Sequence, residues 1–111
     1  MFRDGEGVAQ DYAEAVRWYQ LAAAQGDSFA QYNVGNMFEY GRGVAKDEAE
    51  AVRWWRLAAA QGYAIAQYGL GDMFEYGKGV AKDTAEAVRL YRLAAAQGQA
   101  NATAALERLG A

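Results

Sequence analysis

The chain has 111 residues, of which 53% are hydrophobic and 23% charged, and its formal net charge is −3. One domain fits this length, and the negative charge argues against nucleic-acid binding, which usually relies on a basic surface. The absence of cysteine and histidine excludes disulfides, thiolate chemistry and the commonest metal ligand and general base.

The sequence repeats with a period of 36 residues. The phrase YGRGVAKD, which starts at Tyr40, returns as YGKGVAKD at Tyr76 (76 − 40 = 36), and a divergent copy, DGEGVAQD, starts at Asp4. A period in the thirties is typical of stacked helix pairs. We therefore divide this single repeat domain into an N-terminal half repeat (1–26), two full repeats (27–62 and 63–98) and a C-terminal capping helix (99–111).

About six helices are predicted, two for each period. In chain order they run from Asp11 to about Gln25, over 30–40, from the N-cap at 47 to 62, over 66–76, from the N-cap at 83 to 98, and over 101–109. Their apolar residues recur with helical spacing, so that each helix has one buried side. Aromatic residues on these stripes are predicted to lie in the core or between helices: Trp18, Tyr19, Trp54, Trp55 and Tyr91.

The second helix of each period carries clear start and stop signals. Asp47 can cap the helix with its carboxylate, and Glu50, three residues later, can close a capping box. The same signal recurs at 11/14 and 83/86. Gly62 ends the helix, because glycine takes the left-handed conformation without strain. Within the first helices, Gly35 and Gly71 predict a close approach of the partner helix.

The Gly-x-Gly phrase is interpreted as a turn rather than a phosphate-binding loop. A phosphate loop needs a strand before the glycines and a helix after them, whereas Gly41-Arg42-Gly43 follows a predicted helix. Asp47, at the start of the next helix, would repel an anion. Gly41 is therefore expected to close one helix, and Gly43 to turn the chain toward the next.

These residues resemble the Sel1-like repeat family, relatives of the tetratricopeptide repeats. The family pattern is Ala, Leu-Gly-x-x-Tyr, Gly-x-Gly-Val-x-x-Asp, Ala-x-x-Trp-Tyr and Ala-Ala-x-x-Gly. The second period matches it at Ala30, Val34, Gly35, Phe38, Gly41, Gly43, Val44, Asp47, Ala51, Trp54, Trp55, Ala58, Ala59 and Gly62. The third matches it at Ala66, Leu70, Gly71, Phe74, Gly77, Gly79, Val80, Asp83, Ala87, Leu90, Tyr91, Ala94, Ala95 and Gly98. The departures, Phe for Tyr at 38 and 74 and Leu for Trp at 90, keep the apolar character.

The resemblance implies an all-α, right-handed solenoid of antiparallel helix pairs that binds other proteins and assembles complexes. Family members are seldom catalysts, so we expect neither an enzyme nor a cofactor. Some secreted, cysteine-rich members have been linked to β-lactam binding, but their disulfide pattern is missing here.

In the tetratricopeptide relatives, the first helix of each pair lines a concave groove that holds the partner. The corresponding stripe here consists of Phe29, Tyr32, Asn36, Glu39, Tyr40, Ile65, Tyr68, Asp72, Glu75, Tyr76, Asn101, Ala104 and Arg108. Its acidic residues favour a protein or peptide partner with lysine or arginine, laid in the groove as a helix or an extended segment. Tyrosine suits such a surface because it combines a large ring with a polar tip.

Other readings of this stripe remain open at this point. Helical phase does not decide whether its four tyrosines line a groove or belong to the core. The acidic residues could equally form a solvated face. A catalytic carboxylate pair is the weakest reading, because no nucleophile or metal-ligand set accompanies Glu39, Asp72 and Glu75. We therefore predict no catalytic residue and no metal site.

The two ends of the array differ. Met1-Phe2 corresponds to Met37-Phe38, so the chain is expected to start at the tail of a helix whose body is absent. At the other end, Glu107 replaces the mid-helix glycine, as a capping helix would allow.

The open face expected on the first helix leads to an alternative function, a structural or self-associating repeat fragment without a ligand of its own. It would form a homodimer through the N-terminal helix in preference to head-to-tail growth. A natural truncation and an engineered consensus array both remain open. The sequence has no signal peptide and no membrane span, so a cytoplasmic location is the default, which leaves a removed leader open.

Overall fold

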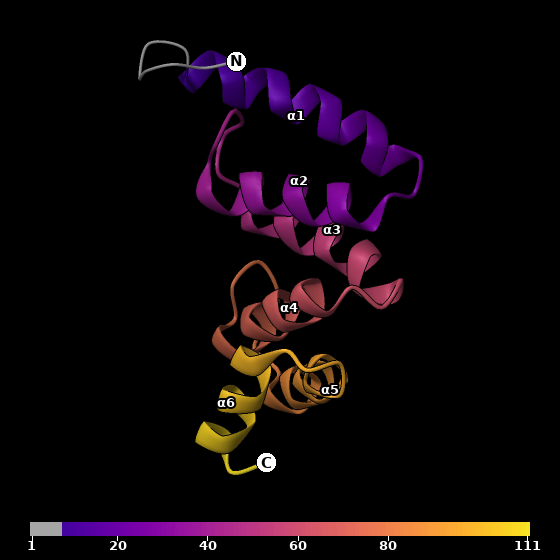
Figure 1. Ribbon diagram of the computed structural model, residues 1–111. Helices are drawn as coiled ribbons and strands as arrows, with labels where there is room; N and C mark the ends of the chain where they lie inside the picture. The colour runs from indigo at the N-terminus through magenta and orange to yellow at the C-terminus, as the bar shows by residue number, and fades with distance from the viewer. Residues whose placement is uncertain (1–7) are drawn as a thin grey trace.

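The computed structural model describes residues 8–111, with side chains from residue 12 onward, and over that range it contains helices and no strand. The helices are α1 (Val8–Ala24), α2 (Ser28–Tyr40), α3 (Glu48–Ala60), α4 (Ala64–Tyr76), α5 (Thr84–Ala95) and α6 (Ala100–Leu109). They stack into an elongated body of 45 × 24 × 23 Å, with α1 and α6 at opposite ends (Figure 1). The predicted all-α solenoid is thereby confirmed. The predictions for Met1, Phe2 and the first glycine-rich phrase at 4–7 lie outside the described residues.

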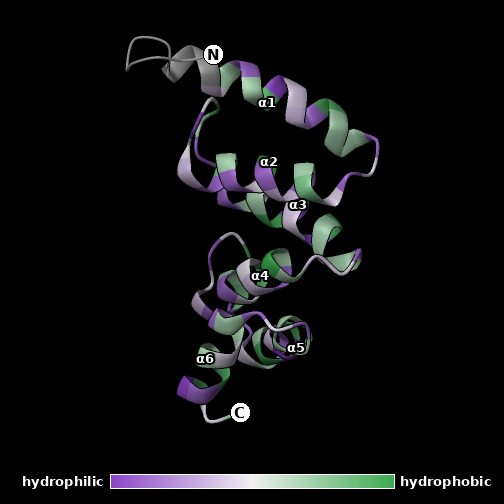
Figure 2. Ribbon diagram, in the orientation of Figure 1, coloured by the Kyte–Doolittle hydropathy of each residue, from purple (hydrophilic) through white to green (hydrophobic). Residues whose placement is uncertain are grey.

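Each helix packs mainly against its neighbours in sequence. The most extensive contacts join α2 to α3 and α4 to α5, the two helices of one repeat, while α3 with α4 links successive repeats. Hydrophobic and hydrophilic residues are interspersed along every helix (Figure 2). Fully buried alanines let the helices approach closely: Ala51, Ala58, Ala66, Ala87, Ala94 and Ala102.

The two mid-helix glycines make room for aromatic rings of the partner helix. A Cβ on Gly35 would lie 2.4 Å from the indole of Trp55, and a Cβ on Gly71 would lie 2.7 Å from the ring of Tyr91. No side chain fits at such distances, which confirms the predicted close approach. Trp55 and Tyr91, predicted as core, are both buried.

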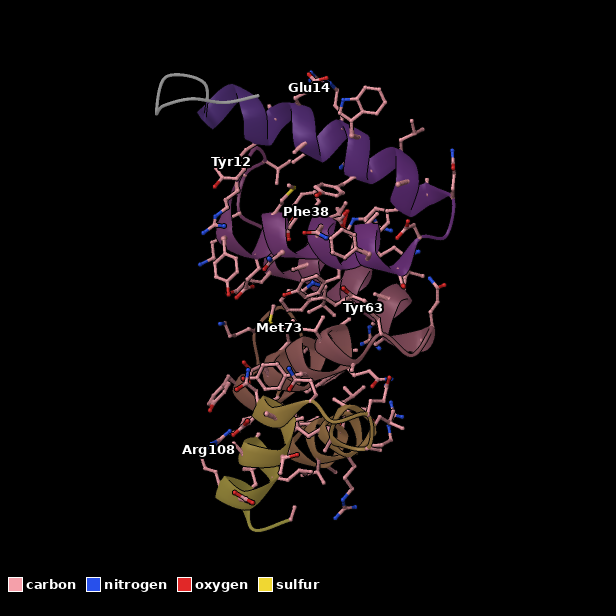
Figure 3. The ribbon with its side chains drawn as sticks, viewed as in Figure 1. Tyr12, Glu14, Phe38, Tyr63, Met73 and Arg108 are labelled. Carbon is pink, nitrogen blue, oxygen red and sulfur yellow. The ribbon has the colours of Figure 1, made fainter. Side chains whose placement is uncertain are left out.

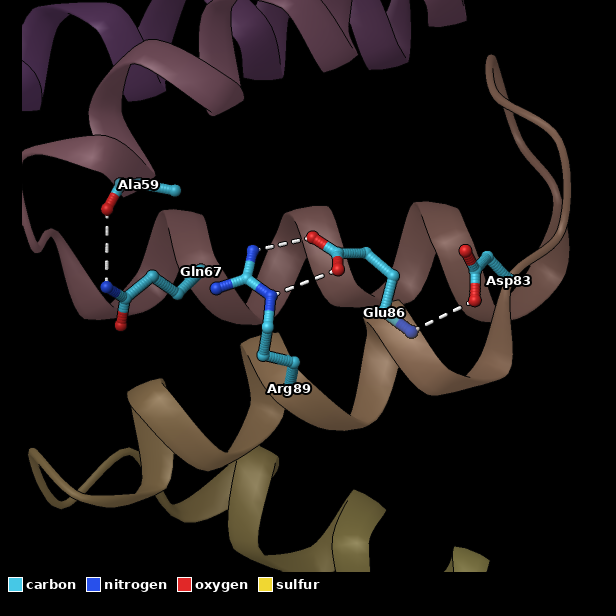
Figure 4. Close-up of polar contacts among 5 residues, drawn as sticks. All are labelled: Ala59, Gln67, Asp83, Glu86 and Arg89. Carbon is cyan, nitrogen blue, oxygen red and sulfur yellow. Dashed lines mark hydrogen bonds and ion pairs between the residues drawn. The ribbon is translucent and has the colours of Figure 1, made fainter.

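The N-caps predicted at Asp47 and Asp83 are formed, but the capping boxes predicted there are not. At the start of α5, Asp83 accepts a hydrogen bond from the backbone N–H of Glu86 at 3.0 Å (Figure 4). The Glu86 side chain does not return this bond, because the backbone N–H of Asp83 already donates to the carbonyl of Phe74 at 2.8 Å. Glu86 instead pairs with Arg89 at 2.6 and 3.0 Å.

The start of α3 repeats this arrangement. Asp47 accepts from the backbone N–H of Glu50 at 3.1 Å, and the Glu50 carboxylate pairs with Arg53 at 2.8 and 2.9 Å.

The Gly-x-Gly phrase is a turn, as predicted, and it also joins successive repeats. Gly41 ends α2 with φ of 65°, and Gly43 has φ of 76°. A Cβ on Gly43 would lie 2.5 Å from the carbonyl oxygen of Tyr12 in α1, and one on Gly79 equally close to that of Glu48 in α3. The turn therefore contacts the beginning of the preceding repeat's second helix, where only glycine fits.

The first helix begins earlier than predicted. The sequence signal placed its N-cap at Asp11, by analogy with the later repeats, but α1 already includes Val8 and Asp11 lies inside it. In the later repeats the turn before the cap is held by its contact with the preceding second helix. Among the described residues, no earlier second helix lies against the start of α1. Ala9 and Gln10 are good helix formers, so the helix includes them.

A ladder of glutamines, which the sequence analysis missed, connects the repeats. Gln67 is buried and donates to the carbonyl of Ala59 at 3.3 Å (Figure 4), and its own side-chain oxygen accepts from Gln97 at 3.0 Å. Gln31 and Gln61 repeat this arrangement one period earlier. The recurrence of glutamine at these positions every 36 residues was the available signal.

Candidate interaction surface

A hollow of about 260 Å³ lies on the side formed by the first helices of successive repeats. Its walls come mainly from α2, α4 and the start of α6. Its lining residues are Tyr32, Glu39, Tyr40, Trp55, Ile65, Tyr68, Gly69, Asp72, Met73, Lys78, Gln99 and Asn101. We call this side of the molecule the first-helix face.

The hollow includes Tyr32, Glu39, Tyr40, Ile65, Tyr68 and Asp72 from the predicted groove, together with Asn101. The other predicted positions do not line it: Phe29, Asn36, Glu75, Tyr76, Ala104 and Arg108. Phe29 is exposed and meets the ring of Tyr19 edge-on at 6.3 Å, beside α1. Asn36 is half-buried in α2, Tyr76 is exposed, and Ala104 and Arg108 are exposed on α6.

The four tyrosines of the predicted stripe fall into two pairs. Tyr40 and Tyr76, at the ends of α2 and α4, are 60% and 57% exposed. Tyr32 and Tyr68 are half-buried, and burial raises the pKa of both hydroxyls. The Tyr32 ring stacks on Trp55 at 6.0 Å, and the Trp55 indole N–H donates to the carbonyl of Tyr32 at 3.0 Å. Trp55 thus holds the inner wall of the hollow in place.

Glu39 is a buried carboxylate with one unused oxygen. Its side chain is 7% exposed, and its Oε2 lies 3.2 Å from the Lys78 ammonium, a contact that raises the pKa of Lys78. Oε1 is buried and has no hydrogen-bond partner among the residues that the structure describes. Such orphaned acceptors are rare in folded proteins and call for an explanation.

Glu75, one repeat later, is also buried, but both of its oxygens are satisfied. Arg108 of α6 donates to Oε2 at 2.6 Å and to Oε1 at 3.0 Å (Figure 3 shows Arg108 at the edge of α6). The Tyr91 hydroxyl lies 2.7 Å from Oε1 and 2.8 Å from Oδ1 of Asp72. The Arg108 guanidinium, followed by the Tyr91 hydroxyl, holds the pKa of Glu75 below its usual range against the effect of burial. Burial, together with the two carboxylates, raises the pKa of Tyr91.

Lys78 and the role of Trp55 in this surface were not predicted from the sequence. A signal for Lys78 existed, because the middle position of the Gly-x-Gly phrase is a cation in both later copies, Arg42 and Lys78. The partner of that cation, Glu39, lies 39 residues earlier, beyond the reach of any local pattern. Trp55 was predicted as core, which it is, but its contact with Tyr32 also makes it a wall of the hollow.

Trp18 does not lie in the core, so that prediction is wrong. Its side chain is 64% exposed on α1, and its indole N–H donates to Glu14 at 3.0 Å. Glu14 itself points away from α2 (Figure 3). The equivalent residue, Trp54, is half-buried against Ala23, Ala30 and Val34, which α1 and α2 supply. The position in the repeat therefore does not by itself bury this tryptophan; the helices that precede it do.

The described residues hold neither a candidate metal site nor a candidate membrane-spanning helix. No group of three or more acidic side chains converges in a way that could hold a metal ion. None of the described helices combines the length and the apolar character that crossing a membrane requires.

Comparison with known proteins finds one family across the chain. A family model described as Sel1 repeat matches residues 1–27, 28–63 and 64–99. A search of the curated proteins gave no match.

Several solved structures are similar to this chain. A protective antigen present in uropathogenic Escherichia coli strains, displaying an SLR fold, is 48% identical over 88% of the chain, with a TM-score of 0.83. A Sel1 repeat protein from Oxalobacter formigenes is 44% identical over 84% of the chain and 70% of its own length, with a TM-score of 0.82. Helicobacter pylori cysteine rich protein B, at 24% identity, covers 82% of the chain and 68% of its own length with a TM-score of 0.78, and supports the fold alone. The chain spans 21% of the length of the Escherichia coli antigen.

Proposed function

This chain belongs to the Sel1 repeat family, and we propose that it binds a segment of a partner protein, or a peptide, on its first-helix face. Sel1 repeat proteins are generally protein-interaction scaffolds and typically lack enzymatic activity. The observation that carries the proposal is the hollow that spans the first helices of successive repeats.

The lining of this hollow suits a protein ligand. Tyrosine rings and the exposed Ile65 offer apolar area, while Glu39, Asp72, Lys78 and the amides of Gln99 and Asn101 offer polar contacts. Aromatic side chains with a polar tip are enriched where proteins bind one another. A volume of about 260 Å³ lies below the range of roughly 300–1,000 Å³ typical of small-molecule sites. It matches a side chain that projects from a longer ligand lying across the helices.

A pair of equivalent tyrosines provides the test. A peptide library displayed on phage would be selected on the wild-type chain, and the selected peptides titrated against Tyr40→Ala and Tyr76→Ala. Both tyrosines end a first helix and have almost equal exposure, but only Tyr40 lines the hollow. We expect Tyr40→Ala to weaken binding about tenfold or more and Tyr76→Ala to change it little. Equal binding by both variants would contradict the proposal.

A second candidate function is self-association through α1, favoured by the exposure of Trp18. The equivalent tryptophan of α3, Trp54, packs against residues of α1 and α2, so the surface around Trp18 has the composition of a stacking interface. Light scattering over a dilution series tests this function. We expect a dimer that Trp18→Glu converts to monomer, whereas the control Leu57→Glu, on the exposed side of α3, leaves it intact. A monomer at all concentrations would rule self-association out.

A further inference from the structure

Resting on the proposed function, we propose that the hollow beside Glu39 binds an arginine side chain of the partner, in the way that Glu75 binds Arg108 within the chain. Three features of the molecule support this proposal: an unused buried oxygen, a filled copy of the same site one repeat later, and the charge of the hollow.

The first feature is Oε1 of Glu39, a buried acceptor with no donor in the described part of the chain. A carboxylate gains most from charged donors, because hydrogen bonds between ionised groups are shorter and stronger than neutral ones. Trp55 cannot act as that donor, since its indole N–H is already used by the carbonyl of Tyr32. Oε1 is also covered from solvent, so a ligand that bonds it must first displace a side chain.

The second feature is the Glu75 site, which acts as a template. A shift of one repeat converts Glu75 into Glu39 (75 − 36 = 39) and Arg108 into Asp72 (108 − 36 = 72). At Glu75 the guanidinium of Arg108 bonds both oxygens. At Glu39 the residue that corresponds to Arg108 is an aspartate, so the chain does not supply the guanidinium there.

The third feature is the charge of the hollow. Its charged residues are Glu39, Asp72 and Lys78, which sum to −1. A monovalent cation neutralises this charge, whereas an acidic side chain would add to it. Arginine fits better than lysine, because a planar guanidinium with five N–H donors can bond Glu39 and Asp72 at the same time. The neighbouring tyrosine rings can stack on its faces.

Access to Oε1 requires Lys78 to move. The Lys78 side chain is 44% exposed and contacts Glu39 through one oxygen at 3.2 Å. A long, flexible lysine exchanges contacts easily at a surface. An incoming guanidinium can therefore displace the ammonium into solvent and take its place on the carboxylate. Lys78 acts as a weak internal competitor, so its removal should strengthen the binding of arginine.

The test compares arginine with its neutral isostere, citrulline. The probes are the blocked tripeptides Gly-Arg-Gly and Gly-citrulline-Gly, titrated into the ¹⁵N-labelled chain. The readout is the NMR signal of the Trp55 indole N–H, which lies in the wall of the hollow. We expect a saturable shift with the arginine probe and at least about tenfold weaker binding of the citrulline probe. Equal binding of the two probes would overturn the inference.

Variants then locate the effect. Glu39→Gln keeps the shape of the site and should abolish the preference for arginine. Glu50→Gln removes the same charge on α3, away from the hollow, and should keep the preference. Asp72→Arg should place a guanidinium on Glu39 from within and block the probe, whereas Lys78→Met should tighten binding. The inference fails if Glu39→Gln retains the preference or if Asp72→Arg leaves binding unchanged.

The peptides selected on phage separate this inference from the function on which it rests. If they depend on Tyr40 but bind Glu39→Gln as tightly as the wild type, the arginine site is wrong and the first-helix face still binds ligands. If they bind Tyr40→Ala without loss, the proposed function itself is wrong. Peptides that carry an arginine and lose at least about tenfold in affinity to Glu39→Gln would support both.

Discussion

The second and third repeats are close copies, yet their equivalent carboxylates lie in different surroundings. Glu75 receives hydrogen bonds from Arg108 and Tyr91 on both oxygens. Glu39 has a single contact with Lys78 and one oxygen without a partner in the described structure. Both glutamates are buried to the same extent, with 6% exposure.

The difference arises from residues outside each glutamate's own helix. Position 55 is tryptophan where position 91 is tyrosine, so the hydroxyl that reaches Glu75 has no counterpart at Glu39. The residue 33 positions later is arginine for Glu75 and aspartate for Glu39 (75 + 33 = 108; 39 + 33 = 72). In a solenoid, the specificity of one repeat is thus set by the next.

The largest expected effect on stability comes from removing Trp55, the buried ring in the inner wall of the hollow. Trp55→Ala should lower the free energy of unfolding by roughly 3–5 kcal/mol, because the buried ring fills the space at Gly35. Trp18→Ala, at an exposed tryptophan, should stay within about 0.5 kcal/mol. Urea denaturation of both variants measures the difference. Equal losses would mean that Trp55 does not support the hollow.

A smaller effect should separate the two glutamates directly. Arg108→Met removes two charge-assisted hydrogen bonds from the buried Glu75 and should lower the free energy of unfolding measurably, although solvent screens the exposed guanidinium. Lys78→Met removes one long contact from Glu39 and should cost less than about 1 kcal/mol. Thermal denaturation in low salt would show which variant is destabilised more. A larger loss of stability for Lys78→Met would contradict our interpretation of the two sites.

The smallest expected effect is on how the free energy of unfolding depends on pH under acidic conditions. The folded pKa of Glu75 is lowered, so its contribution is full above the unfolded value of about 4.3 and is lost as the pH falls through the folded value. The free energy of unfolding should therefore fall less steeply below about pH 5 in Glu75→Gln than in the wild type. Arg108→Met should flatten the curve in the same direction. A slope unchanged by either substitution would contradict the pairing of these two residues.

Much of the fold could be predicted from the sequence because its signals are local. Three features depend only on a few adjacent residues or on one repeating position: the N-cap at Asp47, the end of α2 at Gly41, and the glycine at 35 that leaves room for the Trp55 ring. The capping box failed for a reason the local pattern does not contain. The backbone N–H of Asp47 donates to the carbonyl of Phe38, in the preceding helix. The Glu50 carboxylate therefore has no N–H to accept from at Asp47, and it pairs with Arg53 instead.

The candidate site was less accessible to prediction, because its properties depend on distant neighbours. Helical phase placed Glu39 and Glu75 on one stripe, but it could not tell that both are buried or that Arg108 occupies only one of them. Trp18 and Trp54 share a repeat position, but only Trp54 has helices before it, α1 and α2, that cover its side chain in the described structure. Comparison of residues one repeat apart would have raised both questions.

The most direct test of the account is a double-mutant cycle between Glu39→Gln and Asp72→Arg, measured as free energies of unfolding. The account holds that an arginine at position 72 would bind Glu39 as Arg108 binds Glu75. It predicts a favourable coupling of about 1–2 kcal/mol between the new arginine and the Glu39 carboxylate. A coupling near zero would show that Glu39 does not accept a guanidinium, and would contradict the central claim.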